Sequence, residues 1–240
     1  MIIRKQEEIE PVLAEYYGNL AQFMVNLVEI PDDAVILEPG CGNGALTVHL
    51  LGLLPRSAVI CYDLFRLYEI DLDILKERAV DMRIVKGDVR TMGIHTESVD
   101  FIISNELLCD LSRNDTRKTI NEFYRILRKG GTFVHGCLSP YPETRAQELV
   151  IIADGYSADP LFDHDWFSPP ADELVGMLHS AGFHGITVKY FQDHVKFLGD
   201  AAFCHMKEWV LKPEFFEKYS SEIRSCGIEH PMEQVMYCRK

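Results

Sequence analysis

Short apolar runs alternate with amphipathic stretches along most of this chain. Residues 35–37, 58–62 and 101–103 have the length and composition of buried strands. Between such runs, apolar residues recur three and four positions apart, as they do on one face of a helix. The alternation is typical of right-handed crossovers, and it predicts an α/β fold with a doubly wound, mainly parallel sheet.

Signals for helix ends add to this pattern. Ser112 with an acid three positions later predicts a capped helix start, and the glycine pair at 130–131 predicts the end of that helix. Ser168, which two prolines follow, predicts the start of another helix that Gly182 should end. Upstream of the first strand, the spacing in residues 8–28 predicts one or two amphipathic helices.

Two segments are longer than an alternating fold requires. Residues 138–170 follow one predicted strand, and residues 192–232 separate the last two, at 185–191 and 234–238. Segments of this size in a compact domain are usually functional. Ligands bind beyond the carboxyl ends of parallel strands, where the first segment begins. We therefore expect both segments and the N-terminal helical segment 1–30 to form a lid over the ligand; the alternative is that they only cover sheet edges.

Residues 35–45 are the most informative stretch, because they run from a buried strand through a glycine-rich turn into a helix. Gly40, Gly42 and Gly44 alternate, so the backbone can adopt positive φ and a ligand can approach the main chain. The helix that follows starts with free N–H groups that point toward the turn. The segment predicts a loop that binds a nucleotide cofactor.

Two cofactor classes use a loop of this kind. Residues 40–45 fit the dinucleotide fingerprint G-x-G-x-x-G/A, with Asp63 at a suitable distance for a ribose contact. A nicotinamide-dependent oxidoreductase is therefore one interpretation, and the remaining motifs are needed to decide.

The remaining motifs favour another family. Glu38 ends the first strand beside a proline, Gly44 adds a glycine to the turn, and Asp63 ends a second apolar run. Further motifs follow in order at 82–89, 98–108 and 123–134. In this order they resemble the class I (Rossmann-like) S-adenosylmethionine-dependent methyltransferases. The resemblance implies a seven-stranded sheet whose last strand inserts antiparallel between the two before it.

The resemblance also implies a cofactor site. Glu38 should contact the ammonium of S-adenosylmethionine, Asp63 its ribose hydroxyls and Asp88 its adenine amino group. A carboxylate suits the ribose because it only accepts hydrogen bonds and can engage both hydroxyls. Asn105 and Glu106 should lie where the methyl group is delivered. The full set of expected cofactor contacts is Glu38, Gly40, Cys41, Gly42, Asn43, Gly44, Asp63, Leu64, Asp88, Val89, Asn105 and Glu106.

Methyl transfer from a sulfonium is an in-line displacement, so positioning does most of the work and a general base is optional. Three residues are candidates for a catalytic role: Glu106, Tyr141 and His164. Glu106 has the best place in the motif, whereas His164 stands beside an acid and two aromatic residues. His135 lies in a predicted buried strand, where we expect a hydrogen-bonded core histidine.

Composition narrows the class of protein further. The length of 240 residues predicts a single domain, in which residues 31–137 form the cofactor-binding core. A net charge of −13 disfavours a nucleic-acid acceptor, which needs a basic surface. Seven scattered cysteines are typical of free thiols in a reducing compartment, and no signal peptide or membrane-spanning run is visible. We therefore expect a cytoplasmic protein with no membrane contact. We also expect no metal site, because the nine histidines form no H-x-x-x-H pattern.

The sequence as a whole predicts a methyltransferase that acts on a small molecule. A catalytically silent S-adenosylmethionine-binding partner protein is an alternative that would use the same pocket, and a nicotinamide-dependent oxidoreductase is a third. Acceptor-binding residues vary widely within the family, so the motifs define neither the acceptor nor the oligomeric state.

Overall fold

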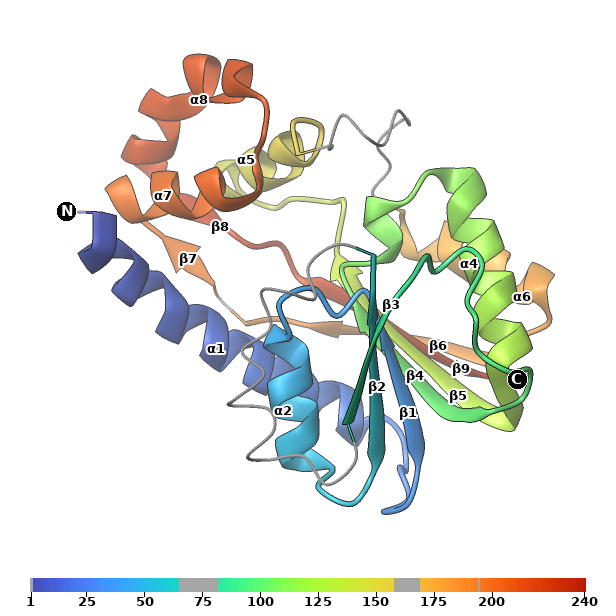
Figure 1. Ribbon diagram of the computed structural model, residues 1–240. Helices are drawn as coiled ribbons and strands as arrows, with labels where there is room; N and C mark the ends of the chain where they lie inside the picture. Colours follow the sequence, from blue (N-terminus) through green and yellow to red (C-terminus); the bar gives the residue numbers. More distant parts are fainter. Residues whose placement is uncertain (1, 65–81, 158–168, 194) are drawn as a thin grey trace.

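The computed structural model describes residues 2–64, 82–157, 169–193 and 195–240. Within these ranges, seven strands form one sheet (Figure 1). In spatial order they are β3 (Met82–Lys86), β2 (Ala58–Asp63), β1 (Val35–Pro39), β4 (Val99–Asn105), β5 (Leu127–Leu138), β9 (Glu233–Arg239) and β6 (His184–Phe191). The strands pair in parallel except β9, which is antiparallel to both β5 and β6. This order confirms the predicted sheet.

The chain reverses direction across the sheet between β1 and β4. From β1 it moves outward to β2 and β3, and then it returns to form β4 on the other side of β1. In open α/β sheets, a ligand crevice forms at such a switch point, outside the carboxyl ends of the strands. The ends of β1 and β4 are therefore the expected location of a site.

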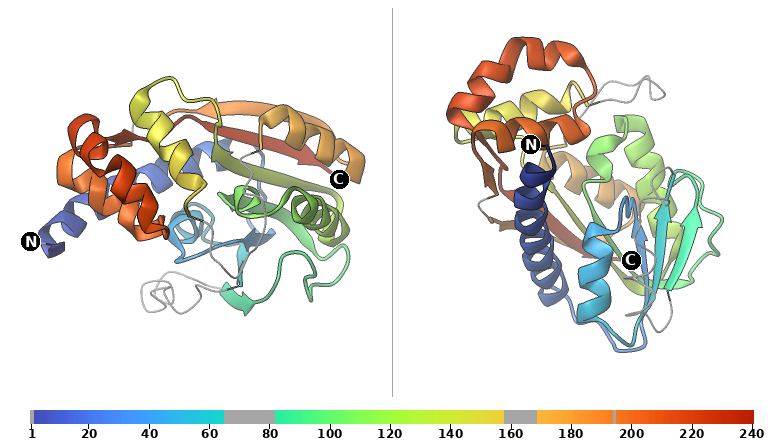
Figure 2. Two further views of the ribbon diagram at one scale, coloured as in Figure 1. Left: turned by 90° about the horizontal axis from the view of Figure 1, so that it is seen from above. Right: turned by 60° about the vertical axis from the view of Figure 1, so that its left-hand side comes forward.

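Helices cover both faces of the sheet (Figures 1 and 2). Neighbouring residues of one strand serve opposite cores, because side chains alternate along a strand. Ile36 packs into the core on the side of α1 (Ile2–Asn26) and α2 (Ala45–Leu53), whereas Leu37 packs toward α4 (Arg113–Ile126) and α6 (Ala171–Ala181). Because both faces of the sheet are buried, the strands have short, continuous apolar sequences.

The remaining helices gather at one end of the sheet. They are α5 (Arg145–Asp154), α7 (Gly199–Trp209) and α8 (Pro213–Cys226), with a small two-stranded sheet of β7 (Lys196–Phe197) and β8 (Ile228–Glu229). Contacts link α1 to α7, α7 to α8 and α5 to α8. Figure 1 shows this helical cap beyond the edge at which β1 and β2 end. The described parts of the two long segments thus lie on the side of the expected site, and α1 reaches them through its contact with α7.

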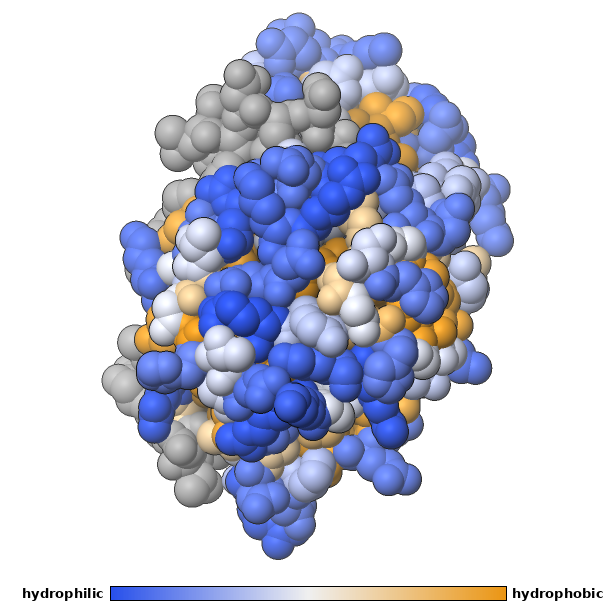
Figure 3. All heavy atoms as spheres, turned by 90° about the vertical axis from the view of Figure 1, so that its right-hand side faces the viewer, coloured by the Kyte–Doolittle hydropathy of each residue, from blue (hydrophilic) through white to orange (hydrophobic). Residues whose placement is uncertain are grey.

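The opposite flank of the molecule carries α4 and α6. Its surface is mostly hydrophilic, with hydrophobic atoms in smaller areas between (Figure 3). Among the described residues, no helix is both long and apolar enough to cross a membrane.

Two predicted helix ends need correction. The helix that Ser112 caps, by accepting a hydrogen bond from the Asp115 N–H, ends at Ile126 and not at the glycine pair. The chain passes directly into β5, where Gly130 has a φ of 76° within an irregular stretch of the β4–β5 pairing. Helix α6 begins after Pro170, with no side-chain cap, and Ser168 lies outside the described residues. The predicted glycine end of α6 is confirmed, since Gly182 has a φ of 103°.

Candidate active site

The glycine turn connects the end of β1 to the start of α2. Gly40, Gly42 and Gly44 have φ angles of 71°, 53° and 85°, a region that favours glycine. A Cβ atom at Gly40 would lie 2.8 Å from Leu107 Cδ1, so this glycine also permits close packing against the segment after β4. Gly44 occupies the N-cap position of α2. The turn therefore has the backbone conformation that the sequence predicted.

Hydrogen bonds join this turn to the end of β2. Gly40 N–H donates to the Tyr62 carbonyl at 2.7 Å, and Gly42 N–H donates to Asp63 Oδ2 at 3.0 Å. Leu64 follows Asp63 directly and is half-buried. Asn43 accepts a hydrogen bond from the Ala45 N–H and so supports the start of α2. The acid at the end of β2 thus lies against the turn.

Glu38 lies buried beneath the turn, with 2% of its surface exposed. The Thr47 hydroxyl on α2 donates to Glu38 Oε2 at 2.6 Å. Burial raises the pKa of the Glu38 carboxyl well above its ordinary value, and the nearby Cys61 thiol and Asp63 carboxyl add to this increase. An ammonium group beside Glu38 would have the opposite effect, because a positive charge favours the ionised carboxylate.

Asp88 follows β3 and is held by an arginine that the sequence motifs did not single out. Arg90 Nη2 lies 2.6 Å from Asp88 Oδ2, and the Arg90 N–H donates to Asp88 Oδ1. These bonds lower the pKa of Asp88. Arg90 also reaches Asp115 at the start of α4, at 3.0 Å. Neighbouring Val89 is buried. Arg90 therefore fixes the orientation of the Asp88 carboxylate and engages both of its oxygens.

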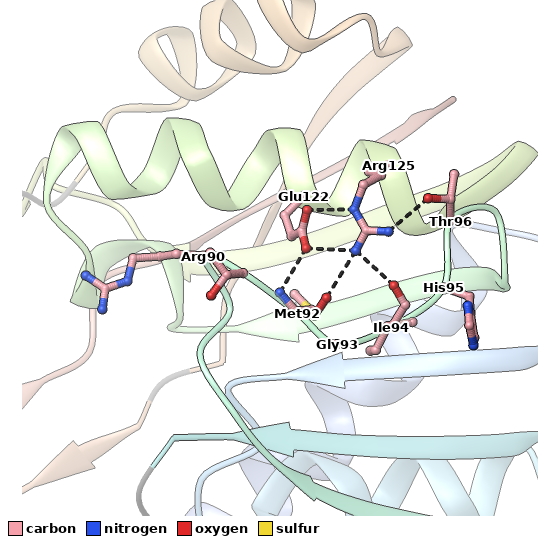
Figure 4. Close-up of a pocket in the computed structure, with 9 residues that line it drawn as sticks. Arg90, Met92, Gly93, Ile94, His95, Thr96, Glu122 and Arg125 are labelled. Atoms are coloured by element: carbon pink, nitrogen blue, oxygen red, sulfur yellow. Dashed lines mark hydrogen bonds and ion pairs between the residues drawn. The ribbon is translucent and has the colours of Figure 1, made fainter.

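A second arginine attaches the next loop to α4 (Figure 4). Arg125 donates hydrogen bonds to the carbonyl groups of Met92 and Ile94 and to the Thr96 hydroxyl. Glu122, one turn earlier, accepts from the Met92 N–H. A hollow of about 550 Å³ lies here, lined by Arg90, Thr91, Met92, Gly93, Ile94, His95, Thr96, Glu122 and Arg125. It lies beside the Asp88 segment and includes no residue of the glycine turn.

Asn105 and Glu106 mark the end of β4. Glu106 has a φ of 51°, which is uncommon for a residue with a side chain and is typical of functional sites. Its Oε1 accepts from the Leu138 N–H at 2.7 Å, and its Oε2 accepts from Cys109 Sγ at 3.2 Å. Burial raises the pKa of Glu106 to about 6, although both hydrogen bonds favour the ionised form. Glu106 therefore changes charge close to neutral pH.

Residues from other parts of the chain complete this region, and sequence reasoning had missed two of them. Tyr16 of α1 donates a hydrogen bond to Glu233, the first residue of β9, which is 1% exposed. The pKa of Asp154 on α5 is raised to about 8, first by burial and then by the charges of Glu106 and Asp110. Neither Asp154 nor Glu233 stands in one of the sequence motifs.

Of the other two predicted catalytic residues, only Tyr141 lies within the described parts of the chain. Tyr141, in the loop after β5, is 67% exposed, and its N–H donates to Ser139 Oγ at 3.3 Å. His164 lies outside the described residues. His135 is a buried core residue, as expected: its Nδ1 lies 2.9 Å from Ser104 Oγ, and burial lowers its pKa to about 3. Within the described ranges, no three His, Cys, Asp or Glu side chains form a group that could hold a metal ion.

An open, doubly wound sheet with a glycine turn at its switch point defines a Rossmann-like domain for a nucleotide cofactor. Residues 37–135 match the family model described as a methyltransferase domain. A malonyl-(acyl-carrier protein) O-methyltransferase of Paenibacillus sp. JDR-2 is 30% identical over 109 residues, which make up 44% of this chain. The match spans only 39% of the length of that relative.

Solved structures share the fold over nearly the whole chain. The YcgJ protein of Bacillus subtilis has a TM-score of 0.64 at 16% identity, over 92% of this chain and 97% of its own. Human N-acetylserotonin methyltransferase, solved in complex with S-adenosylmethionine, has a TM-score of 0.59 at 14% identity, over 98% of this chain and 56% of its own. The two comparisons agree: residues 37–135 are similar to a methyltransferase domain, and the chain as a whole has the fold of solved S-adenosylmethionine-dependent methyltransferases.

Proposed function

We propose that the protein transfers a methyl group from S-adenosylmethionine to a small-molecule acceptor. One observation carries this proposal: Glu38, the glycine turn and Asp63 meet at the carboxyl ends of β1 and β2, and hydrogen bonds hold the turn against Asp63. The likeness to methyltransferases of known fold supports the same cofactor.

The glycine turn and the residues around it have suitable chemistry for this cofactor. Among the described residues, no atom lies within 4 Å of where a Cβ at Gly42 would be, so the space in front of the turn is open. The N–H groups at the start of α2 would bind the carboxylate of the methionine moiety. Buried Glu38 would bind its ammonium group, which would restore the negative charge of that carboxyl.

Further along the sheet edge, the nucleoside would extend over β2 and β3. Asp63 would accept hydrogen bonds from the ribose hydroxyls in addition to the Gly42 N–H, since each carboxylate oxygen has two lone pairs. Asp88 would accept from the adenine amino group, and the Val89 N–H would donate to a ring nitrogen. Arg90 would keep the Asp88 carboxylate ionised and oriented.

When bound, S-adenosylmethionine supplies a methyl group on a positively charged sulfur. The role of the chain is to hold an acceptor in line with that methyl group and to exclude water, which can contribute about 7–11 kcal/mol. Asn105 and Glu106 lie at the end of β4, and the Leu107 side chain lies beside Gly40 of the glycine turn, so this end of β4 would adjoin the bound cofactor. Glu106 is the best placed general base, while Tyr141 and His164 remain candidates from the sequence.

Turnover of a labelled cofactor tests the proposal directly. Protein incubated with methyl-labelled S-adenosylmethionine and a metabolite extract should form S-adenosylhomocysteine together with a labelled product. Cofactor binding without any turnover would identify a silent binding partner instead. Tight binding of NAD(H) with no affinity for S-adenosylmethionine would reverse the assignment in favour of an oxidoreductase.

We also propose that α1, residues 138–170 and residues 192–232 form a lid that closes over the bound cofactor. Limited trypsin digestion with and without S-adenosylhomocysteine measures this. Cleavage after Arg145 and Lys218 should slow when the ligand is present, because closure would bury both bonds. Cleavage after Arg117, on the exposed side of α4, serves as the control and should not change. If the ligand changes the cleavage rate at none of these sites, then these segments only cover the sheet edge.

A further inference from the structure

The connection that follows β4 is held in place from two sides. Residues 106–110 make up this connection, which ends in a short 3₁₀ helix. On one side, the Leu107 side chain lies beside Gly40 of the glycine turn. On the other side, the buried Thr116 hydroxyl of α4 donates to the Leu108 carbonyl at 3.3 Å. The connection therefore has a defined position between the glycine turn and α4.

Two donors from different elements hold the Glu106 carboxylate. Its Oε1 accepts from the Leu138 N–H at the end of β5, at 2.7 Å, and its Oε2 accepts from the Cys109 thiol, at 3.2 Å. The Glu106 N–H donates to the Gly136 carbonyl at 2.9 Å and so holds the backbone at its φ of 51°. Glu106 is only half-buried, and each carboxylate oxygen has a second lone pair. The carboxylate is therefore fixed in orientation but can still accept a proton.

At neutral pH the Cys109 thiol is the donor in this contact. Cys109 is 6% exposed, and burial, followed by the charge of Glu106, raises the pKa of its thiol well above the ordinary value. The thiol therefore keeps its proton at a pH at which Glu106, with a pKa of about 6, is ionised. A hydrogen bond from the thiol favours the ionised form of the carboxyl and fixes one of its two oxygens.

Other titratable groups surround Glu106 within the described residues. They come from α1, β5, α5 and β9, and the charge of Glu106 raises the pKa of each: Tyr16, Tyr17, Cys137, Asp154 and Glu233. The exposed Asp110 lies beside Cys109 and raises the pKa of its thiol. For Glu106 itself, burial raises the pKa, and the bonds from Cys109 and Leu138 lower it. Cys109 is therefore the side chain that most directly favours the ionised form of Glu106.

We propose that Cys109 is a positioning residue for methyl transfer, because its thiol holds the Glu106 carboxylate where the acceptor would lose its proton. This inference rests on the proposed function and on Glu106 as its general base. The acceptor would pass its proton to Glu106 as its electron pair forms the new bond to the methyl carbon. The methyl–sulfur bond breaks at the same time, and its electron pair stays on sulfur. The products are the methylated acceptor, protonated Glu106 and S-adenosylhomocysteine.

Titration of the Glu106 carboxyl tests the hydrogen bond without any turnover. Protein labelled with ¹³C at the glutamate side-chain carboxyls is titrated by NMR, and the signal that disappears in Glu106→Gln is assigned to Glu106. In Cys109→Ala the midpoint should rise by about 0.5–1 pH unit, because a donor to the ionised form is lost. In Cys109→Ser it should stay the same or fall, because a hydroxyl is a stronger donor than a thiol. An unchanged midpoint in Cys109→Ala would overturn the proposal.

The pH dependence of turnover then tests the positioning role. The rate of S-adenosylhomocysteine formation is measured with the metabolite extract and saturating S-adenosylmethionine. At about pH 6 the rate of Cys109→Ala should be about twofold to fivefold below that of the unsubstituted protein, because protonated Glu106 cannot act as a base. At about pH 8 the two rates should be similar, since Glu106 is then ionised in both proteins. Cys109→Ser should restore the unsubstituted profile.

Cys137→Ala is the matched control, because it removes another buried thiol near Glu106. Its pH profile should equal that of the unsubstituted protein, and the same shift in both alanine variants would overturn the proposal. An NMR midpoint that shifts in Cys109→Ala without a shift of the rate profile would also overturn it, because Glu106 would then not be the base. No turnover by the unsubstituted protein at any pH would overturn the proposed function, and with it the positioning role. If Cys109→Ala does not fold, Cys109→Val fills the space without a donor and repeats the test.

Discussion

The Gly40→Ala variant is expected to lose about 2–5 kcal/mol of its free energy of unfolding. A side chain at the φ of 71° costs about 1–2 kcal/mol, and overpacking costs about 1–3 kcal/mol more. The overpacking arises because the new Cβ would lie 2.8 Å from buried Leu107 Cδ1. Thermal unfolding followed by circular dichroism should show a decrease of Tm on the order of 10 °C for a chain of this size.

Gly42→Ala provides a matched control in the same turn. Its φ of 53° carries a similar backbone cost, but a Cβ there meets no atom within 4 Å among the described residues. We expect a decrease in stability of only about 1–2 kcal/mol. The same methyl group would enter the space proposed for the cofactor, so affinity for S-adenosylmethionine should fall more than stability. Equal decreases of Tm in both variants would show that overpacking against Leu107 does not contribute to the loss of stability in Gly40→Ala.

Asp63→Ala should weaken the binding of S-adenosylhomocysteine by about 1.5–3 kcal/mol, or about tenfold to a hundredfold in Kd. The substitution removes the proposed ribose acceptor and the hydrogen bond that Asp63 Oδ2 receives from the Gly42 N–H. Isothermal titration calorimetry measures the change. Asp33→Ala, at an exposed position before β1, should bind the ligand as the unsubstituted protein does.

A ligand without the 2′-hydroxyl separates the two roles of Asp63. In the unsubstituted protein, 2′-deoxy S-adenosylhomocysteine should bind more weakly than S-adenosylhomocysteine. In Asp63→Ala the two ligands should bind equally, because the partner of the hydroxyl is already gone. If the hydroxyl keeps its full contribution in the variant, then Asp63 supports the turn only and the ribose contact lies elsewhere.

Local backbone requirements explain why the glycine turn could be read from the sequence. Gly40, Gly42 and Gly44 each adopt positive φ, which glycine does at little cost because it has no Cβ. The presence of glycine at these positions therefore indicated the turn directly. The same holds for Ser112, whose capping bond reaches only three residues along the chain. Helix α4 nevertheless ends earlier than predicted, because pairing of β5 with β4 already includes Leu127 opposite Val99. There, a contact between distant segments overrode the local glycine signal.

Contacts between side chains that are distant in the sequence could not be predicted in this way. Asp63 and Asp88 could be proposed from motifs, but the arginine that fixes Asp88 acts through a side-chain geometry that no motif describes. Glu233 and Tyr16 are 217 positions apart, and neither stands in a pattern that indicates the other. They meet because β9 inserts between β5 and β6, which brings the start of β9 to the edge where β5 ends.

The sequence by itself determined the alternating fold, the turn at the end of β1 and the acids at or just after the carboxyl ends of β1, β2 and β3. These features depend on periodicity, on glycine backbone freedom and on short-range order, all of which are local properties of the chain. The tertiary structure alone decided that Glu106, Asp154 and Glu233 share one buried region. Their burial and mutual repulsion exist only once distant segments pack together.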